Sequence, residues 1–228
     1  MRHLRFACLG FLLFVSLAVS AEGGKSFWKN VRNEVKKHPE LVKSYIDRLA
    51  RMDTTLTYEQ SVLAFYGQTY LFQDQEENMV STMTKLFMQD SLEAAFDTAY
   101  HILSINPLHI RALITSALIL YQADSTFSYR AGSDDVSYFF KRAFYLLHII
   151  AQTGDGTASH PYFVTKLSDE YDFLSYYLGV KNVRSQSIDM KMPCDILYVD
   201  GINVNSESTN IYFEITRVLE LEKKALGF

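Results

Sequence analysis

Residues 91–122, SLEAAFDTAYHILSINPLHIRALITSALILYQ, decide the fold. Two stretches with apolar residues at helical spacing meet at Asn106-Pro107, where the proline disfavours helix in the residue before it. Small residues such as Ala99 and Ala117 let paired helices approach closely, while large neighbours such as Leu113 fill the space between them. The segment therefore predicts two helices packed as a hairpin.

This hairpin resembles the junction of a tetratricopeptide repeat. The proline falls where that motif ends a helix, and the small and large positions follow its pattern. Only one clear unit is present, whereas a stable solenoid usually needs about three. An ordinary helical hairpin therefore remains the alternative.

The helical periodicity extends on both sides of this segment, from Ser26 to Gln152. Thr57-x-x-Gln60 and Asp90-x-x-Glu93 are both typical of capping boxes that begin helices. Prolines and polar breaks separate the other helices. The expected helical ranges are 26–38, 39–52, 57–70, 77–88, 90–106, 110–121 and 134–152.

The pattern changes after Gly154. Strands are expected at 162–165, 180–188, 195–199 and 210–216, with a hairpin loop at 201–210. Helices are expected at 168–177 and after Arg217. The fold class is thus α+β and mainly α: antiparallel helical hairpins (22–153), followed by a small C-terminal antiparallel sheet with one helix (154–228) packed on them.

Composition agrees with this class. The chain has 10 Gly and 4 Pro among 228 residues, and 48% of its residues are hydrophobic. Turn-dense all-β folds need more Gly and Pro, and disordered chains have fewer apolar residues.

The N-terminus has the three parts of a secretory signal peptide. A basic start, an apolar run at 6–19 and small residues at Val19-Ser20-Ala21 predict cleavage after residue 21. The alternative, a membrane anchor, is disfavoured because the run is shorter than the ~20 residues that span a bilayer. We expect an exported protein, periplasmic or secreted, without a transmembrane segment.

Removing residues 1–21 takes away two of the 22 Lys and Arg and leaves 20 against 26 Asp and Glu, a net charge of −6. Without a contiguous basic run, this charge favours neither nucleic acid nor an anionic membrane as partner. Cys8 is also removed, so Cys194 cannot form an intramolecular disulfide. A protein or peptide partner remains, and the sequence specifies no oligomeric state.

The wider pattern resembles the family called domain of unknown function 4919, found in Bacteroides-type bacteria. The order of several short motifs carries this resemblance. It implies an exported, helical-repeat-like protein and no established activity. The motifs are DTTLTYE at 53–59, YGQTY at 66–70, TGDGT at 153–157, SDEYDFL at 168–174, SQS at 185–187, CDIL at 194–197 and IYFEI at 211–215.

Catalytic and metal-binding patterns are weak. Cys194 is a candidate nucleophile with His160 as its base, against its alternative as a small apolar residue at the start of a strand. Asp155, Asp169 and Glu170 can supply carboxylate oxygens to a cation, or simply end one helix and begin the next. No histidine pair has zinc spacing, and we expect neither a metal nor a cofactor. The acidic pair at 76–77 is expected to be solvated or to cap a helix.

Aromatic residues make up 14% of the chain. Most are expected to pack between helices, and the remainder to contact a ligand. The ligand-binding candidates are Tyr66, Tyr70, Tyr121 and Tyr176.

These observations favour a non-enzymatic helical scaffold that binds a protein or peptide. One alternative is a small hydrolase-like enzyme with a site at the junction formed by residues 155–195. Another is a glycan-binding accessory protein that uses exposed tyrosines.

Overall fold

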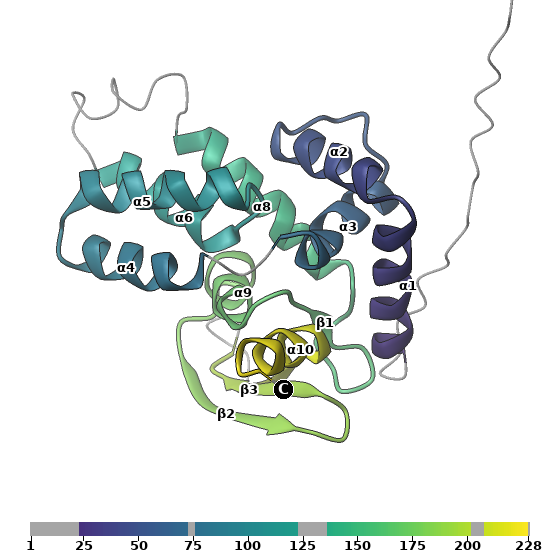
Figure 1. Cartoon of the computed structure of the whole chain (residues 1–228). Helices are drawn as coiled ribbons and strands as arrows, with labels where there is room; N and C mark the ends of the chain where they lie inside the picture. Colours follow the sequence, from purple (N-terminus) through teal and green to yellow (C-terminus); the bar gives the residue numbers. More distant parts are fainter. Residues whose placement is uncertain (1–22, 73–75, 123–135, 202–207, 228) are drawn as a thin grey trace, which may run out of the picture.

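The computed structural model describes residues 23–72, 76–122, 136–201 and 208–227 (Figure 1). The expected signal peptide at 1–21 and most of the expected loop at 201–210 lie outside these residues. Within the described ranges, no helix is both long enough and apolar enough to cross a membrane.

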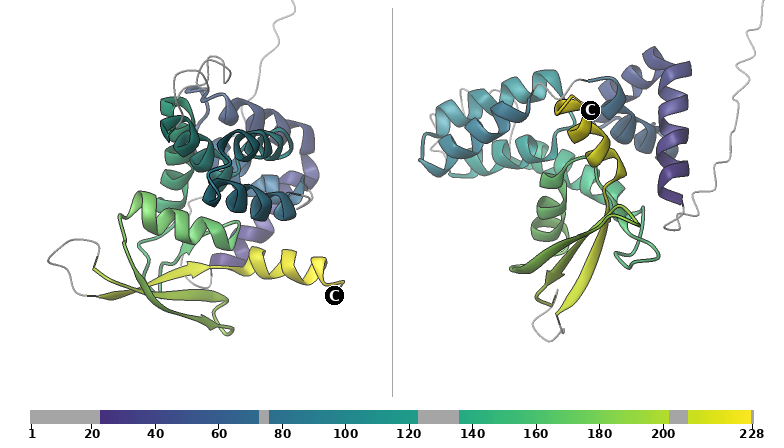
Figure 2. Two further views of the ribbon diagram at one scale, coloured as in Figure 1. Left: turned by 90° about the vertical axis from the view of Figure 1, so that its left-hand side faces the viewer. Right: turned by 60° about the horizontal axis from the view of Figure 1, so that its bottom comes forward.

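The N-terminal part consists of paired helices, as predicted. Helices α4, α5, α6 and α8 follow one another as packed neighbours, while α1, α2 and α3 form a second group beside them (Figure 2). The elements are α1 (Gly23–Lys37), α2 (Pro39–Ala50), α3 (Tyr58–Gly67), the 3-10 turn η1 (Gln68–Tyr70), α4 (Glu77–Met88), α5 (Leu92–Ile105), α6 (Ile110–Gln122) and α8 (Val136–Ala151).

Local sequence explains one of the two predicted helix starts. The Thr57 hydroxyl accepts a hydrogen bond from the Gln60 N–H at 3.3 Å, and the Gln60 side chain accepts one from the Thr57 N–H at 3.0 Å. This capping box is confirmed. The box predicted at Asp90 is wrong, because α5 begins after Ser91 and Asp90 instead ends α4 with a φ of 57°.

The C-terminal part holds a mixed sheet. In the described residues, its strands have the order β1-β4-β3-β2, with bounds β1 (Tyr162–Phe163), β2 (Val183–Asp189), β3 (Cys194–Val199) and β4 (Thr209–Glu214). The pairs β2–β3 and β3–β4 are antiparallel, as expected, but β1 runs parallel to β4. The expected antiparallel sheet is therefore mixed, because the chain crosses through a helix between β1 and β2.

That crossover helix lies between the sheet and the N-terminal helices (Figures 1 and 2). It comprises α9 (Leu167–Asp172) and continues as the π-helical turn η2 (Phe173–Tyr177). A last helix, α10 (Thr216–Ala225), follows β4 and packs against α1.

An aromatic cluster joins the helices to the sheet. Phe27 of α1 packs edge to face against Trp28, Tyr66 and Phe163, with ring centroids 4.9–5.2 Å apart. These rings belong to a continuous hydrophobic cluster that extends from α1 to α10. Helices and sheet consequently share this main core, while a smaller second cluster around Met83 lies between α4, α5 and α6. The predicted packing role of most aromatics holds in the main core.

Candidate functional site

A pair of buried carboxyl groups lies where α9 meets the sheet. Glu170 of α9 and Asp195 of β3 are both 0% exposed. Burial, and after it the neighbouring Asp195, raise the pKa of Glu170 to about 9. A second carboxyl group so close in a dry environment disfavours the charged form of Glu170, so its neutral form is favoured.

Asp195 is also connected to the surface. One of its oxygens accepts a hydrogen bond from the Gln186 amide on the exposed strand β2. The Tyr171 hydroxyl donates to the carbonyl end of the same amide at 2.6 Å. Neither oxygen of Glu170 accepts a hydrogen bond from a donor in the described ranges, which suits a protonated carboxyl at the inner end of this network.

Asp169, the neighbour of Glu170, has a structural role. Its carboxylate accepts hydrogen bonds from the Thr165 N–H at 3.2 Å, the Thr165 hydroxyl at 2.7 Å and the Lys166 N–H at 3.1 Å. These donors precede α9, so Asp169 holds the start of that helix. Burial raises the pKa of Asp169, against the lowering effect of these hydrogen bonds.

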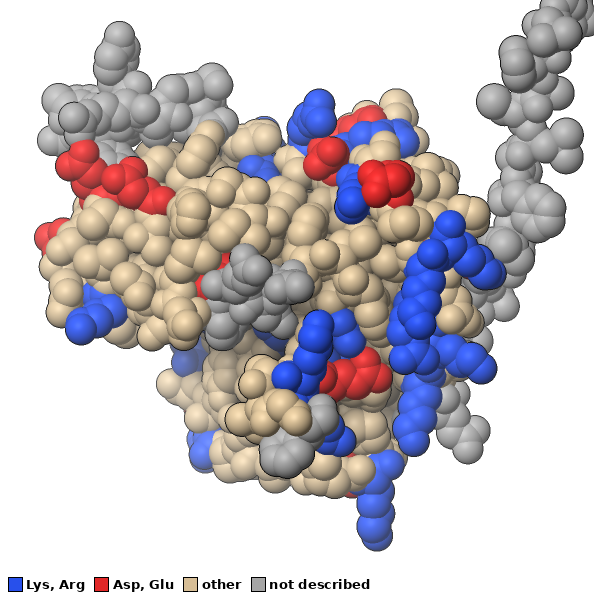
Figure 3. Space-filling model, viewed as in Figure 1, with Lys and Arg blue, Asp and Glu red and all other residues tan. Residues whose placement is uncertain are grey.

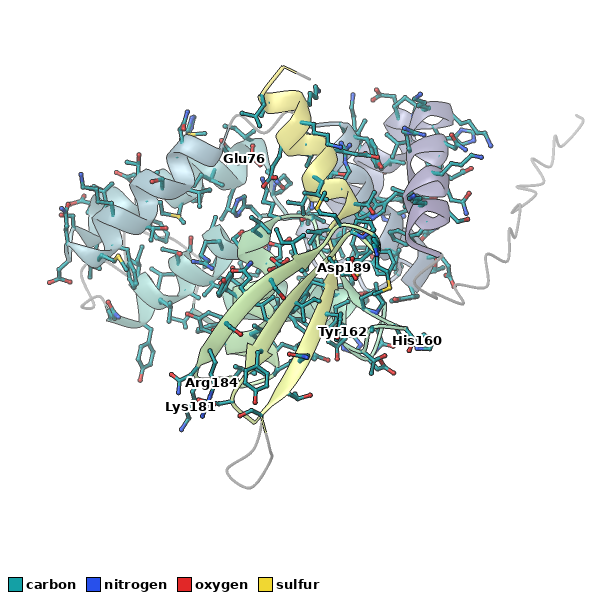
Figure 4. The ribbon with its side chains drawn as sticks, turned by 90° about the horizontal axis from the view of Figure 1, so that it is seen from below. Glu76, His160, Tyr162, Lys181, Arg184 and Asp189 are labelled. Carbon is teal, nitrogen blue, oxygen red and sulfur yellow. The ribbon has the colours of Figure 1, made fainter. Side chains whose placement is uncertain are left out.

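Glu76 is buried as well, at 1% exposed. It accepts a hydrogen bond from the Asn106 amide at 3.1 Å and pairs with the Lys166 ammonium at 3.4 Å. The expectation that Glu76 is solvated or caps a helix is therefore wrong, because it ties the start of α4 to the end of α5 and to the segment before α9. Figure 4 shows it far from the outer end of the sheet.

Asp172 forms a third buried contact at this junction. The Arg111 guanidinium of α6 donates to its carboxylate at 2.8 Å. Burial nevertheless outweighs this neighbour and raises the pKa of Asp172 to about 6. The carboxyl groups of α9 thus face β3, α6 and the segment that precedes α9, and within the described ranges no group of three or more His, Cys, Asp or Glu residues is arranged to hold a metal ion.

Asp155 and His160 lie on an outer loop, apart from this cluster. The Asp155 carboxylate accepts from the Thr157 N–H at 3.0 Å and hydroxyl at 2.7 Å, and these bonds lower its pKa. His160 is exposed, contacts the Ser159 hydroxyl at 3.1 Å and lies at the edge of the molecule (Figure 4). The TGDGT motif therefore builds a turn.

Cys194 and His160 do not form a catalytic pair in this structure. Cys194 is 1% exposed at the start of β3. Burial, and after it the carboxylates of Glu214, Asp189 and Asp195, raise the pKa of the thiol to about 12. A protonated, buried thiol is a poor nucleophile, which agrees with the role of a small apolar residue.

The candidate tyrosines differ sharply in exposure. Tyr66 is 0% exposed, and its hydroxyl donates to the Phe163 carbonyl at 3.0 Å, so no ligand reaches it here. Tyr121, at the end of α6, is 78% exposed and Tyr176, on η2, is 36% exposed. Tyr70 differs from all three because it lines a groove.

The groove lies between α1, η1 and α10 and has a volume of about 620 Å³. The Arg217 guanidinium lies 3.8 Å from the centre of the Tyr70 ring and donates to Thr69 and Glu220. These contacts hold the Arg217 side chain in place in the lining of the groove. The residues that line the groove are Arg32, Thr69, Tyr70, Leu71, Phe72, Arg217, Glu220, Leu221, Lys224 and Ala225.

A stripe of cations leads to this groove along α1. Lys25, Lys29, Arg32 and Lys36 are all exposed and follow one another at intervals of four, three and four residues. This spacing places them on one face of the helix. Figure 3 shows Lys and Arg gathered over α1 and α10 on the same side of the molecule. In the sequence these cations recur at helical spacing but do not form a contiguous basic run, so this basic surface was not predicted.

Comparison with known proteins gives a family. The model of the family described as "Domain of unknown function (DUF4919)" matches residues 25–224. Neither the curated proteins nor the solved structures gave a match.

Proposed function

The chain belongs to the DUF4919 family, and from that premise we propose that it is an exported, non-enzymatic binding protein. Its tetratricopeptide-like helices serve as the scaffold. A protein or peptide partner docks in the groove between α1, η1 and α10.

The groove itself carries this proposal. Its lining combines apolar side chains with the ring of Tyr70, and its volume lies in the range typical of ligand pockets, about 300–1,000 Å³. Arg217 is held by Thr69 and Glu220 before any ligand arrives, so the wall is already ordered. Ordered walls lower the entropy lost on binding.

Site-specific photocrosslinking in the producing cells tests this function. A photoreactive residue at Ala225, in the groove, is expected to give a discrete adduct, and one at Tyr100, which is 57% exposed on α5, is not. Leu221→Asp, which places a charge among the apolar residues that line the groove, is expected to abolish the adduct. Equal adducts at both positions, or an adduct that survives Leu221→Asp in a folded protein, would contradict the proposal.

A hydrolase-like function at the junction is the second candidate. The observation that favours it is the raised pKa of Glu170 beside Asp195, since such pairs often serve as general acid and base. It is weakened because both carboxyls are 0% exposed and no substrate reaches them in this structure. Hydrolysis of an ester or glycoside panel that is lost in Glu170→Gln would favour this candidate over binding.

A further inference from the structure

The groove and the α1 stripe share Arg32, so they form a continuous surface. Neither Arg32 nor Lys224 forms an ion pair with a residue in the described part of the chain, whereas Arg217 is paired with Glu220. Arg32 and Lys224 therefore offer positive charge in the lining of the groove, and the cations of the stripe continue from Arg32 along α1. Apolar side chains, including Leu221 and Phe72, line the same groove.

The spacing of the stripe matches an extended polypeptide. Steps of three and four residues along α1 correspond to about 4.5 and 6 Å at a rise of 1.5 Å per residue. Alternate side chains of an extended strand lie about 6.6 Å apart on one face. Flexible lysine stems bridge the small difference. Acidic residues at alternate positions of an extended segment can thus each meet one cation.

We propose that the α1 stripe and the adjoining groove bind an extended acidic segment of a partner polypeptide, with one apolar side chain of that segment in the groove. This inference rests on the proposed binding function and adds the chemistry of the partner. A single phosphate would use only one or two of the cations, and a flat anionic membrane would leave the apolar part of the groove empty. A polypeptide uses both parts of the surface.

Binding to synthetic peptides tests the inference on the full folded chain. The probe is a 12-residue peptide that alternates Glu with Ser and carries one Leu. Its counterpart replaces every Glu with Gln, and vesicles of phosphatidylglycerol serve as the membrane arm. The stripe variant is Lys29→Glu with Arg32→Glu. The matched control is Lys85→Glu with Lys141→Glu, an equal change of net charge on the exposed surfaces of α4 and α8.

We expect the Glu peptide to bind the unmodified protein at least about tenfold more tightly than the Gln peptide, and more weakly at high salt. The stripe variant is expected to lose about tenfold or more in affinity, and the control variant less than about twofold. Circular dichroism verifies that both variants are folded.

Three outcomes would overturn the inference: equal binding of the Glu and Gln peptides, equal losses in the stripe and control variants, or binding to vesicles alone. If the two peptides bind equally but Leu221→Asp abolishes both, the groove remains a binding site and only the acidic partner is refuted. A groove crosslink that is absent in cells refutes the proposed function itself.

Discussion

At the scale of single residues, the Glu170–Asp195 pair couples protonation to folding. Buried Glu170 has a pKa of about 9, against an ordinary value of 4.5. Between these values the folded chain keeps a proton that the unfolded chain has released. The free energy of unfolding therefore falls as pH rises through this window, by up to about 1.4 kcal/mol per pH unit from this group.

Glu170→Gln is expected to flatten that dependence, because the neutral amide can donate to Asp195 at every pH. Urea unfolding at pH 5, 6, 7 and 8 measures the slope. Glu59→Gln, on the exposed surface of α3, is the control and should keep the slope of the unmodified protein. A Glu170→Gln variant with an unchanged slope would show that Glu170 is already ionised in the fold.

A second prediction at this scale concerns Gly154. A Cβ at this position would lie 2.3 Å from the His160 carbonyl oxygen and 2.4 Å from that of Pro161. Both are backbone atoms, which cannot rotate away as the end of a flexible side chain can. Gly154→Ala is expected to lower the free energy of unfolding by about 1–3 kcal/mol, as overpacking does. Ser159→Ala in the same exposed loop is the control for chemical denaturation, and equal stability of the two variants would refute the close approach.

Some of these residues could be identified from the sequence, but their pairing could not. Asp169 and Glu170 were predicted only as possible cation ligands together with Asp155, or as acidic residues at the start of a helix. The partner of Glu170, however, is Asp195, whose position depends on the register of β3 within the sheet. Such a long-range contact has no local signal. The burial of Glu76 was not predicted either, because it too depends on contacts between residues that are distant in the sequence.

At the scale of elements, two helices end in left-handed residues that are not glycine. Met52 has a φ of 59° after α2, and Asp90 has a φ of 57° after α4. In each case the N–H of the next residue donates a hydrogen bond back to a carbonyl of the helix. The Asp53 N–H donates to the Arg48 carbonyl, and the Ser91 N–H donates to the Leu86 carbonyl. Gly is the usual residue here because a side chain crowds the backbone.

Met52→Gly is therefore expected to raise the free energy of unfolding by about 0.5–1 kcal/mol, measured by urea denaturation. The gain from Asp90→Gly should be smaller, because Asp adopts this conformation more readily than Met does. A loss of stability in Met52→Gly would mean that the packing of the half-buried Met52 side chain outweighs the backbone strain.

The positions of the helices and strands were the features of the fold that the sequence predicted best. Helix ranges followed from local periodicity and from caps such as Thr57 with Gln60, and the strands from alternation. The direction of β1 did not follow, because Tyr162 pairs with Phe213, fifty-one positions along the chain. The cationic stripe was not predicted, because its residues are separated in the sequence and come together only on one face of the α1 helix.

At the scale of the whole molecule, Trp28 holds the two parts together. Its indole N–H donates to the Glu214 carboxylate at 2.6 Å, beside Gly24, where a Cβ would lie 2.8 Å from the same carboxylate. Trp28→Phe removes this donor and leaves part of a buried carboxyl unpaired. The free energy of unfolding is expected to fall by about 2–4 kcal/mol.

Because helices and sheet share one core, the Trp28→Phe variant should still unfold in a single transition. Denaturation followed by circular dichroism and by hydrogen exchange in β3 and β4 measures this. Tyr45→Phe, which deletes a half-buried hydroxyl on α2, is the control and should change stability by under about 1.5 kcal/mol. If the sheet melted before the helices in the unmodified protein, the shared core would not be cooperative.

The bond between Trp28 and Glu214 also constrains the order of folding. It joins residues 186 positions apart, and the entropy lost in closing a loop grows with its length. The helical hairpins are built from contacts between consecutive elements, so they can form quickly. Helix α1 can pack on α2 and α3 early, but we expect its bond to the sheet to form only after β4 is in place. In a growing chain, the Trp28 indole therefore stays without its carboxylate partner until the C-terminal strand has been made.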